Sequence, residues 1–335
     1  MRAQIKAISS YLPQTTLTNQ VLAKQNPNWD MDSVVAKAGV VSRHIAGADE
    51  TSFDMAARAC DQLIKEIGID KNSIDGIIFC TQSPDYIMPP NSHLIHKHLG
   101  LTDRVIAFDL NLACSGFVYA LALCHSLIHS KMASNVLLIT SETYSKFIHP
   151  SDRSSRVLFG DGAAVTLVTG AETKGFIDSE LSSHGDGFEK FYIPAGGMRC
   201  PKSQATSTET TDRNGNVRSL ENIHMDGLGV WSFINSVVPK QIKRVLEKNK
   251  LSIPDIDQFI FHQASQMTID SLIKSLDLQE RQVFINLSQL GNTVSASIPL
   301  AFKQAQEQGV IKENQKIILC GFGVGFSYAT VLLET

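Results

Sequence analysis

Apolar residues along the chain follow two spacings, one typical of helices and one typical of buried strands. From 53 to 67, and again from 231 to 246, apolar positions recur every three or four residues, which predicts helices. Short β-branched runs such as 136–139 and 317–320 are typical of strands buried on both faces. This alternation predicts an α/β fold in which helices cover mostly parallel sheets.

Three apolar segments of the first half recur in the second half, which predicts an internally duplicated chain. We expect the division to fall between a half of residues 1–172 and a half of residues 173–335. The matches are Ile74–Cys80 with Ile256–His262 (offset 182), Asn135–Ile139 with Gln315–Leu319 (offset 180), and Ala164–Val168 with Ala329–Leu333 (offset 165, which requires a longer connection in the first half).

One segment between the halves lacks apolar periodicity. Residues 199–222 are rich in Ser, Thr, Asn and Lys and contain the turn signal Asn214-Gly215. Two interpretations stay open, a surface insertion or a flap over a substrate channel.

Composition excludes several classes of protein. The 335 residues are 43% hydrophobic and 19% charged, with a net charge of −3 and no basic block, which argues against nucleic-acid binding. No apolar run approaches the roughly 20 residues that span a bilayer. The six cysteines show no CxxC or zinc-like spacing, so we expect reduced thiols in the cytoplasm and no metal.

The strongest candidate for chemistry is Cys114, in a strand-like stretch that leads through small residues into an apolar helix. We expect it at the first turn of that helix, where free N–H groups and the helix dipole would lower the thiol pKa. Its backbone N–H could serve as one half of an oxyanion hole. Taken alone, the residue also fits a small buried apolar cysteine.

Two further polar residues lie where α/β proteins build sites. His262 follows a predicted strand, and Asn292 lies in a Gly- and Ser-rich turn before a helix. A neutral histidine can polarise a carbonyl, and an asparagine amide donates without changing charge. Taken singly, each also fits a structural role.

Together these motifs resemble the β-ketoacyl-acyl-carrier-protein synthase III family of thiolase-superfamily condensing enzymes, over essentially the whole chain. The resemblance implies an internally duplicated five-layer αβαβα sandwich, a homodimer, and no cofactor. The motifs are Gly39–His44, ACSGF at Cys114, Ser151–Arg153 followed by Phe159–Ala164, HQA at His262, GNT at Asn292, and Gly321–Phe326.

The resemblance also implies a reaction. Cys114 would take an acyl group from an acyl-CoA, and His262 and Asn292 would stabilise the enolate formed as malonyl-acyl carrier protein (malonyl-ACP) loses carbon dioxide. The product is a β-ketoacyl thioester of fatty acid biosynthesis. The backbone N–H of Val324 would join that of Cys114 in the oxyanion hole. Two further roles are implied, with Phe322 shaping the pocket and Met88 reaching across a dimer to limit acyl length.

Some substrate-binding positions depart from the family pattern. Lys37 replaces an arginine and Ser33 replaces an aromatic residue that stacks on the CoA adenine, whereas Arg153 is kept.

Other departures affect the pantetheine arm and the carrier protein. Leu228 replaces an amide that contacts pantetheine, Ser265 ends the usual HQAN motif, and Met267 replaces a basic residue of carrier docking. A specialised condensing enzyme or acyltransferase of secondary-metabolite or surface-lipid biosynthesis, with a different donor or acceptor, is therefore the alternative.

Other readings fit less well. A thiolase needs a second cysteine where Gly321 stands, although Cys320 is adjacent, and hydroxymethylglutaryl-CoA synthase needs a glutamate where only Asp85 is available. Members that transfer acyl groups to alcohols or amines replace Asn292 by aspartate. A non-catalytic scaffold would not need all three of the Cys, His and Asn residues.

Overall fold

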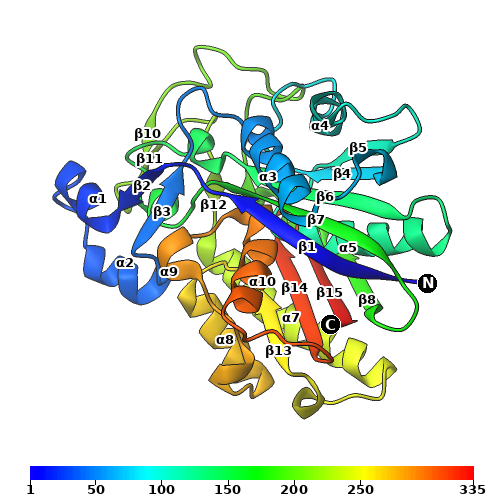
Figure 1. The fold of residues 1–335 in the computed structure, drawn as a ribbon. Helices are drawn as coiled ribbons and strands as arrows, with labels where there is room; N and C mark the ends of the chain where they lie inside the picture. Colours follow the sequence, from blue (N-terminus) through cyan, green and yellow to red (C-terminus); the bar gives the residue numbers. More distant parts are fainter.

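Two stacked β-sheets form the centre of the molecule. The computed structural model describes residues 1–335, and Figure 1 shows the two sheets with helices between and outside them. The first sheet has the strand order β1-β7-β6-β4-β5 and the second β13-β14-β15-β8. The strands are β1 (Arg2–Tyr11), β4 (Gly76–Cys80), β5 (Ile106–Leu110), β6 (Asn135–Glu142), β7 (Gly162–Ala171), β8 (Gly175–Ser183), β13 (Gln258–Phe261), β14 (Lys316–Gly323) and β15 (Ser327–Glu334).

Six helices complete the five expected layers. Helices α3 (Ser52–Ile67) and α4 (Asn91–Leu99) pack on the outer face of the first sheet. Helices α5 (Gly116–His129) and α10 (Ser297–Glu307) fill the space between the sheets. Helices α7 (Gly227–Lys248) and α8 (Gln266–Leu276) cover the outer face of the second sheet. The order helix, sheet, helix, sheet, helix confirms the predicted αβαβα sandwich.

Short elements occupy the loops around these layers. The short helices are α1 (Asn19–Gln25), α2 (Met31–Ala38), α6 (Arg153–Arg156) and α9 (Leu287–Leu290); the short strands are β2 (Thr15–Thr18), β3 (Ser42–Ile45), β9 (Phe191–Tyr192), β10 (Thr210–Thr211), β11 (Val217–Arg218) and β12 (His224–Met225); the 3-10 turns are Lys71–Ser73, Tyr144–Phe147, Gly185–Lys190, Ile253–Asp255, Glu280–Gln282 and Val294–Ala296.

Both helices predicted from apolar spacing are present. Helix α3 begins with a capping box, in which Thr51 and Asp54 satisfy each other's backbone N–H groups, and ends at Gly68 in the left-handed conformation. Helix α7 begins four residues before the predicted stretch because the Asp226 side chain accepts from the N–H of Gly229.

The two sheets repeat the same strand order, as the matched sequences predicted. The order β1-β7-β6-β4 in one sheet corresponds to β8-β15-β14-β13 in the other. In place of β5, the second sheet has only a single bridge, between Phe259 and Val283.

One of the three sequence matches is wrong by one residue. The offset of 180 pairs Val136 with Lys316, but Val136 faces the middle helices and so does Ile317. The structural offset of β6 and β14 is therefore 181. A slip of one residue reverses the face of every side chain in a strand, so burial decides the register where sequence similarity does not.

The chain passes from one sheet to the other between Ala171, the end of β7, and Gly175, the start of β8. The expected division between residues 172 and 173 falls in this connection.

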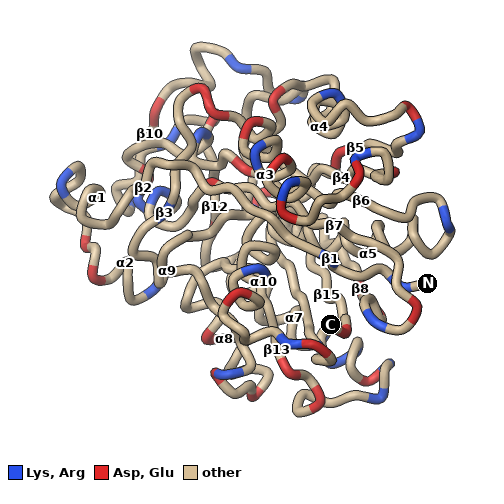
Figure 2. The backbone as a smooth tube through the Cα atoms, viewed as in Figure 1, with Lys and Arg blue, Asp and Glu red and all other residues tan.

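Charged residues lie mainly on outer helices and loops. Figure 2 shows Lys and Arg interspersed with Asp and Glu around the periphery, while the central strands of both sheets carry few of either. Each helix of the structure is too short or too polar to cross a membrane.

Candidate active site

The three residues singled out in the sequence meet in one cavity where the two halves join. Cys114 lies in the turn before α5, His262 follows β13 directly, and Asn292 follows α9. All three line a cavity of about 470 Å³, together with Phe322. The first half thus supplies the thiol, and the second half supplies the imidazole and the amide.

The sulfur of Cys114 occupies space left by a glycine. Cys114 is 4% exposed, and a Cβ built on Gly323 would lie only 2.9 Å from its sulfur. Gly323 is the last residue of β14, so the second sheet ends directly against the thiol. Helix α5 begins at Gly116, two residues after Cys114, which is later than the predicted first turn.

The expectation of a lowered thiol pKa is wrong. Burial and the nearby carboxylate of Glu142 raise the pKa of Cys114 well above its usual range. Hydrogen bonds to the sulfur from the N–H groups of Cys114 and Val324 lower it by less. Cys114 therefore rests as a thiol.

His262 is held neutral with one ring nitrogen already paired. It is 1% exposed, and this burial lowers its pKa to about 3. Its Nδ1 lies 2.6 Å from the hydroxyl of Ser297, the first residue of α10. When Ser297 donates to Nδ1, the ring proton lies on Nε2, which can donate to a substrate oxygen. The ring of Phe322 meets the imidazole edge-on, with centroids 5.6 Å apart.

Asn292 is oriented by a strained neighbour. Its Oδ1 accepts from the backbone N–H of Val294 at 2.9 Å, while its Nδ2 donates a long hydrogen bond, of 3.4 Å, to the carbonyl of Ala264. Val294 makes its contact with a φ of 54°, a left-handed conformation rare for a β-branched residue and costly by about 1–3 kcal/mol. Because the strained turn holds Oδ1 as the acceptor, Nδ2 is the end of the amide that can donate to a substrate.

A buried carboxyl group beside this site was missed in the sequence. Glu142 is fully buried at the end of β6 and accepts from the backbone N–H of Gln82 and from three hydroxyls. Burial outweighs these donors and raises its pKa to about 7. Glu142 is the last residue of an apolar strand and belongs to no local motif, so its place beside the site can be recognised only in the folded structure. The hydroxyl donors are those of Thr81, Ser83 and Ser295.

A second cavity, of about 500 Å³, adjoins the first. Lys37 and Arg153 both line it, as does Ser33, and Ser265 and Met267 line both cavities. The two cavities form a channel that leads from two cations to the thiol.

The segment 199–222 forms part of the wall of this channel. Its strands β10 and β11 make a hairpin around Gly215, whose φ of 79° confirms the predicted turn. Asn214 and Asn216 line both cavities. Arg218 fixes the hairpin by ion pairs to the buried Asp152 at 2.9 Å and to Asp212 at 3.3 Å. The segment is therefore more than an uninvolved surface insertion, since it borders the channel over which a flap was the alternative interpretation.

The remaining predicted residues lie farther from the thiol. Leu228 is 75% exposed at the rim of the first cavity. Met88 is 79% exposed in the loop before α4 and lines none of the larger cavities. Val324, the residue after Gly323, lines a third cavity, of about 300 Å³.

Two residues weighed for other reactions have structural partners. Cys320 packs in the apolar cluster under α7 and α8, away from the middle layer that carries Cys114. Asp85 accepts from the backbone N–H of Phe53 in the first turn of α3 and from the side-chain amide of Asn91, the first residue of α4.

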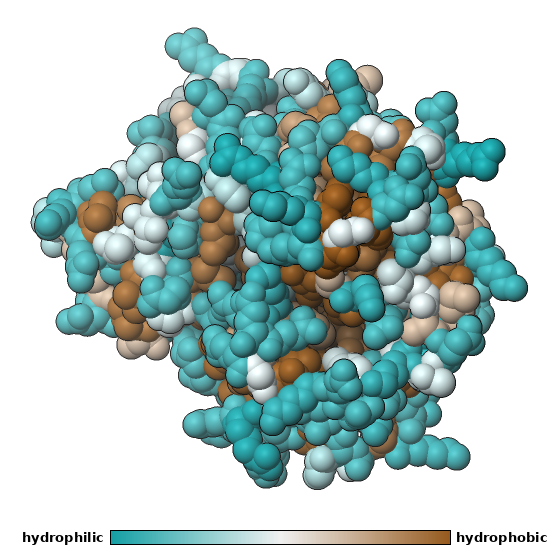
Figure 3. All heavy atoms as spheres, in the orientation of Figure 1, coloured by the Kyte–Doolittle hydropathy of each residue, from teal (hydrophilic) through white to brown (hydrophobic).

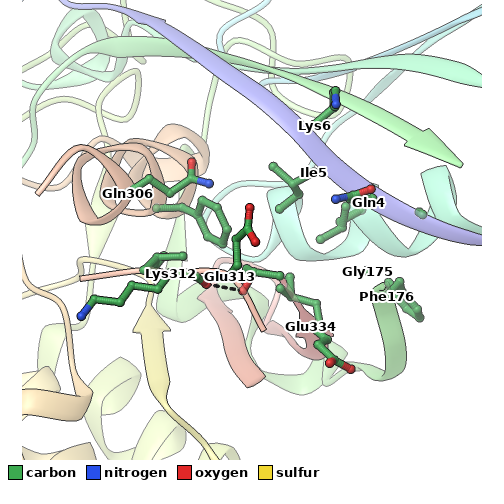
Figure 4. Close-up of a pocket in the computed structure, with 15 residues that line it drawn as sticks. Gln4, Ile5, Lys6, Gly175, Phe176, Gln306, Lys312, Glu313 and Glu334 are labelled. Atoms are coloured by element: carbon green, nitrogen blue, oxygen red, sulfur yellow. Dashed lines mark hydrogen bonds between the residues drawn. The ribbon is translucent and has the colours of Figure 1, made fainter. Parts of the chain in front are cut away.

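A fourth cavity lies at the opposite ends of the strands. Figure 3 shows apolar side chains in a hollow between the two halves on this face of the molecule. The cavity measures about 370 Å³ and contains no cysteine or histidine. Its polar residues include Gln4, Lys312, Glu313 and Glu334 (Figure 4). It shares no residue with the cavity of Cys114.

A buried cysteine beside a neutral histidine and an asparagine amide, between the halves of a duplicated five-layer sandwich, characterises the thiolase-fold condensing enzymes. Comparison with known proteins narrows the class. Residues 108–185 match the family model described as 3-oxoacyl-[acyl-carrier-protein (ACP)] synthase III, and residues 246–335 match the model of its C-terminal part.

Relatives match along the whole chain. A β-ketoacyl-[acyl-carrier-protein] synthase III of Campylobacter fetus subsp. fetus is 37% identical over 334 residues, which cover 99% of this chain and 98% of that protein. A crystal structure of a 3-oxoacyl-(acyl-carrier-protein) synthase III superposes with a TM-score of 0.97 at 36% identity and covers both chains fully. A synthase of Burkholderia xenovorans superposes with a TM-score of 0.91 at 30% identity, over 100% of this chain and 94% of that one. The chain belongs to the β-ketoacyl-acyl-carrier-protein synthase III family and is a condensing acyltransferase.

Proposed function

We propose that the chain makes β-ketoacyl thioesters for fatty acid biosynthesis from an acyl-CoA and malonyl-ACP. The observation that carries this proposal is the convergence of Cys114, His262 and Asn292 on one cavity. Each group is prepared for one part of the chemistry, the sulfur by two N–H donors and the imidazole and amide by fixed partners.

The first step transfers the acyl group. The Cys114 sulfur attacks the thioester carbon, and the N–H groups of Cys114 and Val324 bind the oxygen of the tetrahedral intermediate. The bond from the carbonyl carbon to the CoA sulfur then breaks, and the proton of the Cys114 thiol passes to the CoA thiolate. Because the thiol is buried, its deprotonation is coupled to substrate binding rather than complete beforehand.

The second step forms the carbon–carbon bond. The bond between the malonyl carboxylate and C2 breaks, carbon dioxide leaves, and the thioester oxygen carries the enolate charge. Nε2–H of His262 and Nδ2–H of Asn292 donate to that oxygen. C2 then attacks the acyl carbon, the bond to Cys114 breaks, and the released thiolate takes up a proton. Decarboxylation supplies the carbanion, so the chemistry uses no cofactor.

The second cavity fits the nucleotide end of CoA. Lys37 and Arg153 place two cations there against one carboxylate, that of Asp30. These cations would bind phosphate groups, with Ser265 along the pantetheine arm and Leu228 at its rim. Ser33 offers no ring for adenine stacking.

The proposed assembly is a homodimer in the cytoplasm, where six unpaired cysteines stay reduced. Strand β5 is an uncovered edge of the first sheet, with half-buried residues. Ile87 and Met88 are 85% and 79% exposed in the loop between β4 and α4, which fits insertion into a second copy. Light scattering tests this assembly, and a monomeric mass at micromolar concentration would contradict it.

Intact-protein mass spectrometry tests the function. The wild type and Cys114→Ala are incubated with acetyl-, butyryl- and hexanoyl-CoA and then chased with malonyl-ACP or malonyl-CoA. We expect an acyl adduct on the wild type that disappears in the chase as a β-ketoacyl product forms. Cys124→Ala is the matched control, since Cys124 is a buried cysteine of α5, the helix that follows Cys114. An adduct on Cys114→Ala, or no adduct with any acyl-CoA, would overturn the proposal.

A further inference from the structure

The third cavity begins beside the nucleophile and ends at polar groups. Val324, whose N–H hydrogen-bonds the Cys114 sulfur, lines it, and Phe191 lines both this cavity and that of Cys114. Its volume of about 300 Å³ is at the lower end of the range for small-ligand sites. If Cys114 carries an acyl group as proposed above, this is the space next to the thioester that the acyl chain can enter. The walls are mostly aromatic and aliphatic: Tyr144, Phe147, Phe188, Phe191, Tyr192, Ile193 and Ile223.

The exceptions in this lining are two amides, of Gln82 and Asn111. The Oε1 atom of Gln82 accepts from the hydroxyl of Tyr144 at 2.5 Å, while no protein group accepts from its Nε2. That hydrogen bond fixes which end of the amide carries the free donor. The Asn111 amide makes no hydrogen bond within the protein and is exposed.

The backbone of Gln82 is also held in place. Its N–H donates to both oxygens of the buried Glu142, at 3.3 and 3.1 Å. The amide therefore projects from a fixed point, and Tyr144, on the turn that follows β6, sets its orientation. Such a group is prepared to bind a ligand atom before the ligand arrives.

A hydrocarbon chain would leave this donor unpaired. An acyl chain that fills this largely apolar cavity displaces water from the donor. A donor left unpaired in this way disfavours binding by about ten-fold or more, whereas a carbonyl or hydroxyl oxygen at the same place would pair with it. We propose that Gln82 selects acyl groups that carry a hydrogen-bond acceptor near the far end, such as oxoacyl or hydroxyacyl thioesters, over alkyl groups of equal size.

Two thioesters of nearly equal shape separate polarity from size. 4-Oxopentanoyl-CoA and 4-methylpentanoyl-CoA differ by an oxygen in place of a methyl group at C4. The measurement is the rate of adduct formation on Cys114, by intact mass, with both thioesters at equal limiting concentration and acetyl-CoA as a reference. For the wild type we expect the oxo compound to react at least about ten-fold faster.

Substitutions at Gln82 test whether its amide causes the preference for the oxo compound. Gln82→Leu and Gln82→Met each remove the amide, and either is expected to bring the ratio of the two rates to about 1 or below. Gln62→Leu is the matched control on the exposed face of α3 and is expected to keep the wild-type ratio. Because the readout is a ratio within each variant, a general loss of stability does not imitate the effect.

The outcomes distinguish this inference from the function on which it rests. Equal rates, or a faster methyl compound, in the wild type would overturn the selectivity while the adduct itself supports acyl transfer to Cys114. A ratio that persists in both Gln82 variants would overturn the role of Gln82. Absence of an adduct with all three thioesters would overturn the proposed function, and the inference with it.

Discussion

The two halves of the molecule bring equivalent positions to the boundary between them but carry different side chains there. Helices α5 and α10 begin 181 residues apart, at Gly116 and Ser297, and β6 and β14 end 181 residues apart, at Glu142 and Gly323. At the same offset Ser295 corresponds to Cys114 and Asn111 to Asn292, while the offset of 182 pairs Cys80 with His262.

The contacts at these positions show why one half has room for a nucleophile and the other does not. Gly323 leaves room for the sulfur of Cys114, whereas its counterpart Glu142 fills the equivalent space and accepts from Ser295 at 2.7 Å. One copy of the arrangement is thus open and holds a nucleophile. The other is closed by a hydrogen-bonded carboxyl group. Duplication supplies the geometry twice, and the side chain at the strand end decides which copy can admit a substrate.

The largest expected effect comes from removing the side chain of Cys114, compared with removing that of its counterpart Ser295. Cys114→Ala should lower acyl-enzyme formation by at least about 10³-fold because no other side chain replaces the nucleophile. Ser295→Ala removes only a hydrogen bond to Glu142 and should keep the adduct. Intact mass after incubation with acyl-CoA measures both. Comparable losses in the two variants would refute the asymmetry.

Removing the charge of Glu142 should change how stability depends on pH. Its pKa of about 7 in the folded protein is above the usual 4.5, so the protonated form favours folding, and stability falls as pH rises through 7. Between pH 5.5 and 7.5 this carboxyl group should cost about 2 kcal/mol of unfolding free energy.

Glu142→Gln should remove that part of the slope. Urea unfolding at both pH values measures it, with Glu247→Gln on the exposed face of α7 as control. An unchanged slope in Glu142→Gln would show that Glu142 is ionised throughout.

Filling the space at Gly323 beside the Cys114 sulfur should impair catalysis more moderately. Gly323→Ala places a Cβ 2.8 Å from the Cys114 Cβ and 2.9 Å from its sulfur, so the thiol must shift. We expect acylation to slow by about ten-fold or more, since small displacements of a nucleophile are costly. Gly185→Ala is the matched control, because a Cβ there meets no atom within 4 Å. Stopped-flow acylation rates that match in the two variants would contradict the steric argument.

The smallest expected effect concerns the partner of His262. Ser297→Ala removes the hydroxyl beside Nδ1 and should slow condensation about five-fold, a loss of about 1 kcal/mol, while acylation changes less. Its counterpart Gly116 carries no side chain. Because the pKa of His262 is lowered to about 3, wild-type condensation should show no acid limb near pH 6.5. Such a limb would mean that the imidazole titrates in the active enzyme.

Local sequence patterns predicted the frame and the three polar residues of the site. Apolar spacing defined α3 and α7, and the repeated strands defined the two sheets. What sequence could not supply depends on neighbours distant along the chain. The pKa of Cys114 is set by burial against Gly323 and Glu142, not by its own helix, and the match of β6 with β14 needed burial to fix its register. Gln82 and Tyr144 lie 62 residues apart, so their pairing is visible only in the fold.

The exposed edge of β5 also limits how many copies can associate. Strands β1 and β8 lie against each other, with Gly175 packed on the backbone of Ala3, and β13 is covered by the segment that contains Val283. Of the edges of the two large sheets, only that of β5 is therefore free to pair. A single self-complementary edge is used up when two copies meet about a two-fold axis, so growth stops there. Because an irregular segment stands beside β13 in place of a fifth strand, the second large sheet offers no further strand edge from which pairing could continue.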